Sequence, residues 1–393
     1  LYLNQIYFGN GVYGIKSASK LYFGKDPSNL TLQECALLAS IPRSPSLYNP
    51  YTERERAISR MNYILQRMRS LNFISEDQLE EARNSPLLFN PPPTRRRLAP
   101  YFTDYILKNL EEDLGRERLY GEVREIRTTL NYSYQKIAED ALKEGLESIR
   151  DRNRKLYSQY GEEPEGCVLI ISTRTGEILS MVGGSDYSKT QFNRCVQAKR
   201  TVGSAIKPFI YSTVIKMGFA QSETLWDTPV SYTWKGKKWS PQNYDRKYRG
   251  LVTVRRALEL SLNIPTVRLL SRIGVEAVAD ELSKFGFSME DKADLTIALG
   301  TISQTPLNLV SAFSSFFNRV MGMDGEELYR PSYLAKKVLT QQVAFVMEDM
   351  LKGVVKNGTG RFAEEFSGRI GGKTGTTDDY RDAWFIGCSH QIC

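Results

Sequence analysis

Histidine is almost absent from this sequence of 393 residues: the only one is His390, three positions before the last residue. A Ser/His/Asp triad needs a histidine to accept the proton of its serine, so that arrangement is excluded. Any serine nucleophile in this chain must therefore take its base from a lysine, a carboxylate or a tyrosine.

Cysteines are few, odd in number and scattered, and no two of them stand in a CxxC pair. This spacing supports neither a zinc site nor a redox motif, and it leaves the redox compartment open. Two cysteines flank His390, but two thiols and one imidazole are too few for a structural metal site. We expect no metal and interpret that grouping as incidental. The five cysteines are Cys35, Cys167, Cys195, Cys388 and Cys393.

Long apolar runs are lacking as well. No stretch reaches the ~18–20 consecutive apolar residues that a membrane-spanning helix needs, and no signal peptide opens the sequence. The sequence does not begin with Met and starts inside what reads as a structured segment. We therefore expect a piece of a longer protein, and the missing signal says nothing about its compartment.

The formal net charge is +8, but no recognition motif for DNA or RNA accompanies it. We expect no nucleic-acid partner and interpret the charge as a basic surface that faces anionic lipid or an acidic polymer. The longest basic cluster, Arg95 to Arg97, follows three prolines and lies in an apparent linker.

The N-terminal residues 1–73 read as helices. A Thr31/Glu34 capping box predicts a helix over 31–40, and apolar spacing predicts another over 54–69. Glycines 9, 11 and 14 fit either a substrate-facing loop or a helix end and turn. Residues 74–98 shift to proline and charge and read as a connector.

The remainder reads as an α/β domain behind a small linker region. Helices are predicted over 100–112 and 134–149, with a strand over 124–130 between them. Strands over 168–171 and 178–182 form a hairpin around Gly176, and a second hairpin closes the chain with 369–377, a turn at 378–380 and 382–388. A mostly helical region over 203–358 separates the hairpins. We expect one antiparallel sheet to join the first and last parts.

Ser204 and Lys207 form an SxxK motif at a predicted helix start, marked by Gly203 and Pro208. Residues three apart share a helix face, a helix N-terminus favours an oxyanion, and a buried lysine can act as a neutral base. A chance match is the stronger reading for this motif alone, because Ser17 to Lys20 also fits it.

Two further motifs follow in order. Ser261-Leu262-Asn263 precedes Ile264-Pro265, which predicts an interhelical loop that presents two polar groups or simply ends a helix. Lys373-Thr374-Gly375-Thr376 lies on a predicted strand edge, where it could bind an extended peptide with a terminal carboxylate or form a polar hairpin arm.

The SxxK, SxN and KTG motifs occur in this order, with their first residues 57 and 112 positions apart. This trio is typical of penicillin-binding proteins and class A β-lactamases. Beyond the trio, the chain resembles class A, bifunctional penicillin-binding proteins over nearly its whole length. The segments that carry this resemblance are Tyr2–Gly14, Ala99–Phe102, Thr128–Leu130, Phe192–Ala198, Trp239–Asn243, Tyr248–Gly250 and Arg255–Leu258.

The resemblance implies three parts: the helical tail of a lysozyme-like glycosyltransferase domain over 1–73, a linker over 74–160, and a transpeptidase domain over 161–393. The last has an α/β, serine β-lactamase-like fold with an antiparallel sheet and a helical subdomain. The family's glycosyltransferase glutamates and membrane anchor are expected upstream of Leu1. The implied location is the extracytoplasmic side of the bacterial cytoplasmic membrane.

The resemblance also implies the chemistry. Ser204 would attack the D-Ala–D-Ala amide of a peptidoglycan stem peptide, Lys207 would take its proton, and Ser261 would relay protons to the leaving group. Asn263 would orient Lys207 and the substrate. Backbone N–H groups of Ser204 and Thr376 would form the oxyanion hole. The substrate carboxylate would be held by Lys373, Thr374 and Thr376, on the strand that contains Gly375.

A second stem peptide would supply the amine that forms the cross-link, and β-lactams would trap Ser204. No cofactor is implied for this reaction, and a divalent cation is a candidate only for the glycosyltransferase part, whose partner is the glycan strand. Beyond Gly387 the residues through Cys393 depart from the family's expected strand and helix. We therefore expect exposed apolar surface and slow folding or acylation. A β-lactamase, a carboxypeptidase and a non-catalytic penicillin-recognising module are the alternatives.

Overall fold

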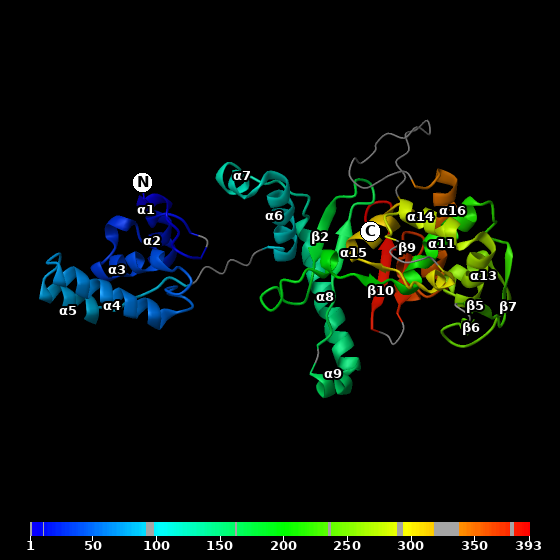
Figure 1. Ribbon diagram of the computed structural model, residues 1–393, viewed down its shortest axis with the longest axis horizontal. Coiled ribbons are helices and arrows are strands. Elements are labelled where there is room, and N and C mark those ends of the chain that lie inside the picture. Colours follow the sequence, from blue (N-terminus) through cyan, green and yellow to red (C-terminus); the bar gives the residue numbers. More distant parts are fainter. Residues whose placement is uncertain are drawn as a thin grey trace. The chain divides into compact units, whose positions relative to one another are not determined.

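The computed structural model describes residues 2–10, 12–91, 98–161, 163–234, 237–288, 294–317, 338–377 and 381–393. The chain divides into two compact units, Leu1–Arg97 (blue in Figure 1) and Leu98–Cys393 (cyan to red). The basic cluster at 95–97 and the turn at 378–380 lie outside the described residues.

The N-terminal unit is helical, as expected. Thr31 caps its third helix, α3: the Thr31 hydroxyl accepts from Glu34 N, and Glu34 Oε2 accepts from Thr31 N at 2.9 Å. Its apolar side packs on α4 around Leu37 and Leu65. The helices are α1 (Tyr2–Gln5), α2 (Ile15–Phe23), α3 (Leu32–Ser40), α4 (Arg54–Ser70) and α5 (Glu76–Asn84), with short 3-10 turns η1 (Pro27–Asn29) and η2 (Ile41–Arg43).

Helix α5 occupies part of the segment that the sequence suggested as a connector. Ser75 and Gln78 form a second capping box at its start, and Leu79 and Ala82 are buried in the core of the N-terminal unit. A few apolar residues at helical spacing are enough to fold this charged segment. The division of the chain at residues 73 and 160 stays a prediction.

The second unit opens with α6 (Pro100–Leu114), α7 (Arg116–Gly121), α8 (Tyr132–Arg152) and α9 (Arg154–Tyr160), and the two predicted helices are confirmed. The predicted strand over 124–130 is wrong, because residues 123–131 form no strand. Their side chains are almost all exposed, so no apolar face fixes a register. Only Thr129 Oγ1 and Asn131 N bond to the neighbouring backbone, at Ile178 and Leu179.

Both predicted hairpins are confirmed. Strand β1 (Val168–Ile171) pairs antiparallel with β2 (Ile178–Val182), with Gly176 at φ +75° in the turn. Strand β9 (Gly371–Thr376) pairs antiparallel with β10 (Ala383–Cys388). Val168 and Ile170 pack on α8, whereas Ile171 joins the main core on the opposite face. Figure 1 shows α8 against the β1–β2 hairpin.

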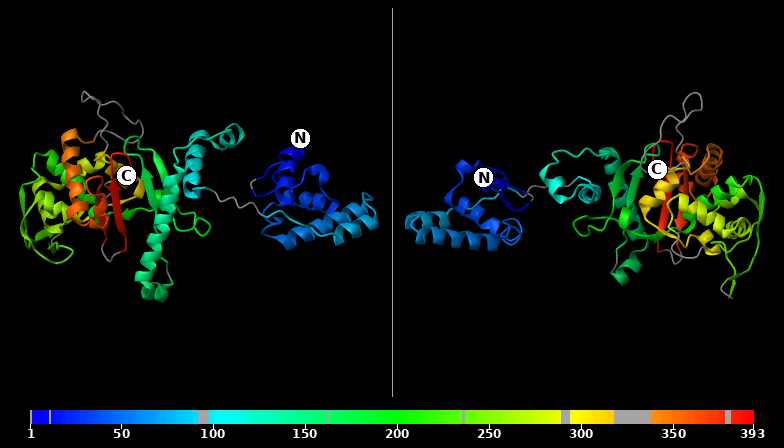
Figure 2. Two further views of the ribbon diagram at one scale, coloured as in Figure 1. Left: turned by 180° about the vertical axis from the view of Figure 1, so that it is seen from behind. Right: turned by 45° about the horizontal axis from the view of Figure 1, so that its top comes forward.

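Residues 391–393 connect the two hairpins. After β10 the chain turns at Ser389, whose N–H donates to Ile392 O, and runs antiparallel to β1. Cys393 and Ile171 exchange two backbone hydrogen bonds of 2.9 Å, and Thr173 N donates to Gln391 O. The two hairpins of the unit therefore lie side by side (green and red in Figure 2, left), but an isolated bridge links them, not the single antiparallel sheet that the sequence predicts.

The intervening region is mostly helical, as expected, and packs around Phe209, which contacts four other phenylalanine rings. Short two-stranded ladders that the sequence did not predict also occur among its described residues: β3·β8, β4·β7 and β5·β6. No helix among the described residues is long and apolar enough to cross a membrane. The elements are α10 (Arg194–Gln197), β3 (Arg200–Thr201), η3 (Gly203–Ile206), α11 (Lys207–Lys216), β4 (Thr224–Asp227), β5 (Tyr232–Trp234), β6 (Lys237–Trp239), β7 (Gly250–Thr253), α12 (Val254–Glu259), α13 (Asn263–Ile273), α14 (Val275–Lys284), η4 (Leu295–Leu299), β8 (Ser303–Gln304), α15 (Pro306–Ser314), α16 (Gln341–Asn357) and η5 (Arg361–Phe366).

Candidate active site

Ser204 lies in the 3-10 turn η3, which leads directly into α11. The predicted helix start is confirmed: Lys207 N donates to Ser204 O, and Pro208 stands in the first turn of α11. Side chains three residues apart eclipse in a 3-10 turn, so Ser204 and Lys207 lie on one side. The first backbone hydrogen bond within the turn runs from Ala205 N to Val202 O. The Ser204 N–H therefore precedes the hydrogen bonds of the turn and has no acceptor within it.

The Lys207 amine is completely buried and contacts the SxN segment. Its Nζ donates to Ser261 O at 2.6 Å, to Asn263 Oδ1 at 2.7 Å and to Leu262 O at 3.2 Å, and it lies 3.4 Å from Ser261 Oγ. All of these acceptors are neutral. Desolvation, followed by repulsion from Lys373, holds the pKa of Lys207 well below its usual range.

Lys373 brings a second buried amine to the same hydroxyl. Its Nζ donates to Ser261 Oγ at 2.9 Å and to Thr374 O at 2.8 Å, and desolvation lowers its pKa to about 7. Two buried ammonium groups that contact the same hydroxyl repel each other, so one of them readily gives up its proton. The site therefore contains an amine that can accept a proton near neutral pH.

The SxN segment joins α12 to α13. Ser261 adopts a left-handed conformation with φ +55°, which is uncommon for a residue with a side chain and turns the chain between the helices. The expectation that the whole triplet lies on a loop is wrong for Asn263, which begins α13. Pro265 lies in the first turn, where its missing N–H costs no hydrogen bond, so Ile264 stays helical.

Two glycines allow strand β9 to lie close against the Ser204 turn, and a third allows the end of η4 to approach the same turn. A Cβ at Gly375 would lie 2.6 Å from Val202 O, and one at Gly203 would lie 2.4 Å from Thr376 O. A Cβ at Gly300 would lie 1.8 Å from Gly203 O. The contact with Val202 O shows why a side chain at position 375 would not fit. Thr376 therefore lies beside the turn that contains Ser204.

The Thr374 hydroxyl faces a residue that the motifs do not include. It donates to Thr359 Oγ1 at 2.8 Å, and Thr359 lies between Gly358 and Gly360 just after α16. The Thr359 backbone N–H donates to Glu259 O on α12. Two hydroxyls on separate elements thus stand next to each other beside the KTG strand.

The second SxxK match lacks these surroundings. Ser17 and Lys20 are both exposed on α2 of the N-terminal unit. An exposed amine lacks the desolvation that a buried amine such as that of Lys207 undergoes. Burial therefore distinguishes the two matches.

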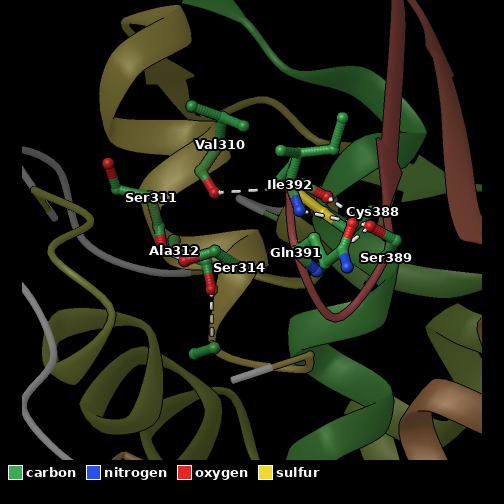
Figure 3. Close-up of a disulfide and its surroundings, with 10 residues drawn as sticks. Val310, Ser311, Ala312, Ser314, Cys388, Ser389, Gln391 and Ile392 are labelled. Carbon is green, nitrogen blue, oxygen red and sulfur yellow. Dashed lines mark hydrogen bonds between the residues drawn. A yellow bond between two sulfur atoms is a disulfide. The ribbon is translucent and has the colours of Figure 1, made fainter. Parts of the chain in front are cut away.

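The cysteines that flank His390 are not incidental, which corrects the sequence interpretation. Cys388 and Cys393 form a disulfide that lies beside α15, as Figure 3 shows. His390 faces Glu348 Oε1 through Nε2 at 3.1 Å and Phe317 O through Nδ1 at 3.2 Å. No group of three potential metal ligands occurs within the ranges that the structure describes.

Sequence reasoning found the three motifs but missed their supports. Asn243 bonds to the start of α13, Gln242 O accepts from Asn263 Nδ2, and Trp384 Nε1 donates to Thr201 O next to the nucleophile's turn. Gly300 and Thr359 were also missed. The glycines on either side of Thr359 were the one local signal of a close approach.

A family model of the penicillin-binding protein transpeptidase domain matches residues 166–391, and a model of the transglycosylase family matches residues 1–69. The first match covers more than half of the chain and contains all three motifs. The chain belongs to the family of penicillin-binding proteins with a transpeptidase domain.

Particular members of the family resemble the entire chain. Penicillin-binding protein 1A of Aquifex aeolicus is 34% identical over 477 residues, which cover 100% of this chain and 65% of the relative. Penicillin-binding protein 2D of Bacillus subtilis is 35% identical over 420 residues, which cover 100% of this chain and 58% of the relative. The chain thus spans less than two thirds of the length of these curated relatives.

Solved structures share the fold. Penicillin-binding protein 1A from Haemophilus influenzae matches with a TM-score of 0.80 at 24% identity, covering 100% of this chain and 79% of that chain. The PonA1 protein from Mycobacterium tuberculosis in complex with penicillin V matches with a TM-score of 0.57 at 19% identity, covering 75% of this chain and 82% of that chain. At these identities the likeness shows the fold alone.

Proposed function

We propose that this chain is a serine-type acyltransferase, a D,D-transpeptidase that cross-links peptidoglycan stem peptides. The observation that carries the proposal is the convergence of two buried lysine amines, Lys207 and Lys373, on the Ser261 hydroxyl beside the Ser204 turn. A neutral amine in such a place can activate a serine without a histidine.

The reaction has two steps. Ser204 Oγ attacks the carbonyl of the D-Ala–D-Ala amide while the Lys207 amine takes its proton, and the backbone N–H groups of Ser204 and Thr376 stabilise the oxyanion. The proton passes through Ser261 to the leaving D-Ala amine, which gives the acyl-enzyme. An amine of a second stem peptide then attacks the ester, forms the cross-link and releases Ser204.

The remaining site residues bind the donor. Lys373 supplies positive charge for the terminal carboxylate, with Thr374 and Thr376 as hydroxyl donors, while Gly375 keeps the strand close to the nucleophile. Asn263 orients Lys207 and the substrate amide. A β-lactam has the same carboxylate and a strained amide, so it acylates Ser204. The PonA1 protein, which has the same fold, was solved in complex with penicillin V, and this complex supports the choice of ligand.

Transfer to an amine, rather than to water, is proposed because the chain also matches the transglycosylase family at its N-terminus. Polymerising and cross-linking one polymer is a coherent pair of activities, whereas a β-lactamase or a carboxypeptidase needs no such part. The substrate of the N-terminal part would be the glycan strand. Membrane anchoring and an extracytoplasmic location are part of the same proposal.

A fluorescent penicillin tests the proposal directly. The wild-type chain should form a stable covalent adduct. Ser204→Ala should form none, because alanine has no hydroxyl oxygen from which the ester could form. Ser17→Ala is the matched control, since it removes the serine of the other SxxK match, and it should label as wild type does.

Other outcomes separate the alternatives. Rapid loss of the adduct with release of hydrolysed penicillin would identify a β-lactamase. Transfer of a stem peptide to water but never to an added amine would identify a carboxypeptidase. Equal labelling of wild type and Ser204→Ala would exclude Ser204 as the nucleophile.

A further inference from the structure

Asn263 holds the Lys207 amine, but helix α13 contains no side chain that fixes its own start. Asn263 is the first residue of α13, and the preceding Leu262 provides no side-chain cap. A helix start leaves N–H groups unpaired unless an outside group accepts from them. The orientation of Asn263 therefore depends on whatever bonds to these N–H groups.

Asn243, from the loop between β6 and β7, does so. Its Oδ1 accepts from Asn263 N at 2.9 Å and from Ile264 N at 3.3 Å. The preceding residue adds a third bond, because Gln242 O accepts from Asn263 Nδ2 at 2.8 Å. With its amide nitrogen held in this way, Asn263 directs Oδ1 toward Lys207 Nζ. The loop thus holds both the backbone N–H and the side-chain nitrogen of Asn263.

Asp227, at the end of β4, determines which way the Asn243 amide faces. Asn243 Nδ2 donates to Asp227 Oδ1 at 2.7 Å and to Lys247 O at 2.8 Å. A carboxylate only accepts hydrogen bonds, so the nitrogen must face Asp227 and the oxygen must face α13. Asp227 Oδ2 accepts from Arg249 N at 3.0 Å, and the Arg249 guanidinium lies 3.8 Å away.

Burying this carboxylate and this amide costs desolvation free energy, which their hydrogen bonds must offset. Asp227 is 0% exposed and Asn243 is 4% exposed. A buried carboxylate is stable only when hydrogen bonds or an ion pair compensate its desolvation. Asn243 Oδ1 accepts from the start of α13, whose first residue, Asn263, bonds to Lys207. Asn243 Nδ2 donates to Asp227 and to Lys247 O.

We propose that Asp227 and Asn243 form a positioning pair for the proton-accepting site: Asp227 orients Asn243, Asn243 fixes the start of α13, and Asn263 thereby holds the Lys207 amine at the nucleophile's turn. The inference rests on the proposed function, since it assigns the pair to the step in which Lys207 takes the Ser204 proton. Both residues are buried and would act through Asn263.

Exchanging the two side chains tests the pair. Asn243→Asp alone places two carboxylates in contact, and Asp227→Asn alone removes the acceptor-only partner. The double variant Asp227→Asn/Asn243→Asp restores the pattern: the carboxylate at 243 accepts from α13 and from the amide at 227, and only Lys247 O loses a donor. The readouts are the rate of labelling by fluorescent penicillin, its pH dependence and the melting temperature.

We expect each single variant to label about 10-fold more slowly or worse, as for the loss of a buried charge-assisted hydrogen bond. The pH of half-maximal labelling should fall, because a displaced Asn263 no longer stabilises the protonated amine. The double variant should recover most of the rate and the wild-type pH midpoint. If either single variant fails to fold, the double variant decides the question alone.

Asn193→Ala is the matched control. Asn193 is similarly buried, but its amide donates to Tyr101 O and approaches Met181 Sδ. Its loss should lower the melting temperature without moving the pH midpoint. The inference is overturned if the single variants keep the wild-type rate and midpoint, or if a well-folded double variant stays as slow as the singles. Failure of wild type to label at Ser204 would instead overturn the proposed function.

Discussion

Lys373 illustrates at the residue scale how burial couples stability to pH. Its folded pKa of about 7 lies below the value of ~10.4 for an exposed lysine. Below pH 7 both states are protonated, and the full cost of burying the ammonium weakens the fold. Between these two pKa values the unfolded state binds more protons, so the contribution of Lys373 to the unfolding free energy rises with pH.

Lys373→Met should therefore change the pH dependence of stability in one direction. Urea unfolding at pH 6 and pH 9 should give a variant that gains more free energy over wild type at pH 6 than at pH 9. Lys20→Met, at an exposed lysine, should leave the difference between the two pH values unchanged. A Lys373→Met effect that is equal at both pH values would contradict the depressed pKa.

Lys207→Arg tests the base. Arginine keeps the charge but cannot be deprotonated in a protein, so it cannot accept the Ser204 proton. We expect acylation by penicillin to slow about 10²-fold or more, as for loss of a general base. In wild type the rate should rise with pH as the buried amine loses its proton. Lys20→Arg is the control, and an acylation rate of Lys207→Arg close to wild type would exclude Lys207 as the base.

Thr359 lies outside the motifs and contacts the Thr374 hydroxyl of the expected carboxylate site. Thr359→Val keeps the shape and removes the partner of the Thr374 hydroxyl. Loss of one hydrogen bond predicts about a 10-fold fall in kcat/KM for a penicillin that carries its carboxylate. The methyl ester of the same penicillin should lose less. Thr175→Val, in the β1–β2 turn, is the control, and an equal loss with acid and ester would separate Thr359 from carboxylate binding.

At the scale of elements, glycines determine how closely β9, η3 and η4 approach one another. Gly300 and Gly286 have nearly the same φ, +83° and +84°, but a Cβ at Gly300 would meet Gly203 O whereas one at Gly286 would meet nothing within 4 Å. Both alanine variants pay the same backbone strain, about 1 kcal/mol.

Only Gly300→Ala must also displace the Ser204 turn. It should lose about 2 kcal/mol or more in urea unfolding, an overpacking cost, together with most of its penicillin labelling. Gly286→Ala should lose about 1 kcal/mol and label normally. If the two variants behave alike, the close approach at Gly203 has no consequence for the site.

Local patterns predicted the elements whose determinants are local. The hairpin at Gly176 and the Thr31 capping box need only neighbouring residues, and both were found. The segment 124–130 has a strand-like sequence but no apolar side to bury, so partners elsewhere in the chain decide its state. Asn263 was misplaced because a proline in a first turn permits a helix that a proline further along would break.

The candidate site divides in the same way. Ser204, Ser261 and Lys373 were predicted because each stands in a short motif, and the structure brings their motifs together. Asn243 and Thr359 stand in no such motif. Their roles arise from contacts across 20 and 15 residues, and tertiary packing alone sets those distances. Patterns within one segment cannot encode such contacts.

At the scale of the whole unit, the first and last strands complete one another. The β1–β2 and β9–β10 hairpins stand at opposite ends of its sequence, and residues 391–393 bridge them through Ile171 and Thr173. Residues 391–393 thus pair along β1, while the exposed apolar surface and the slow folding or acylation expected from the sequence stay predictions. The KTG strand belongs to one of these hairpins, so their association bears on the site.

The Cys388–Cys393 disulfide holds this closing segment against β10, since it links the last residue of β10 to the residue that pairs with Ile171. Closing a loop of about six residues stabilises a fold by about 2 kcal/mol in the chain-entropy model.

The double variant Cys388→Ser/Cys393→Ser should therefore melt several degrees lower than oxidised wild type. Reducing agent should bring wild type to the melting temperature of the variant and leave the variant unchanged. Cys35→Ser, at an exposed free thiol, is the control. A wild-type melting temperature that reducing agent does not change would mean that the two hairpins hold together through their backbone bonds alone.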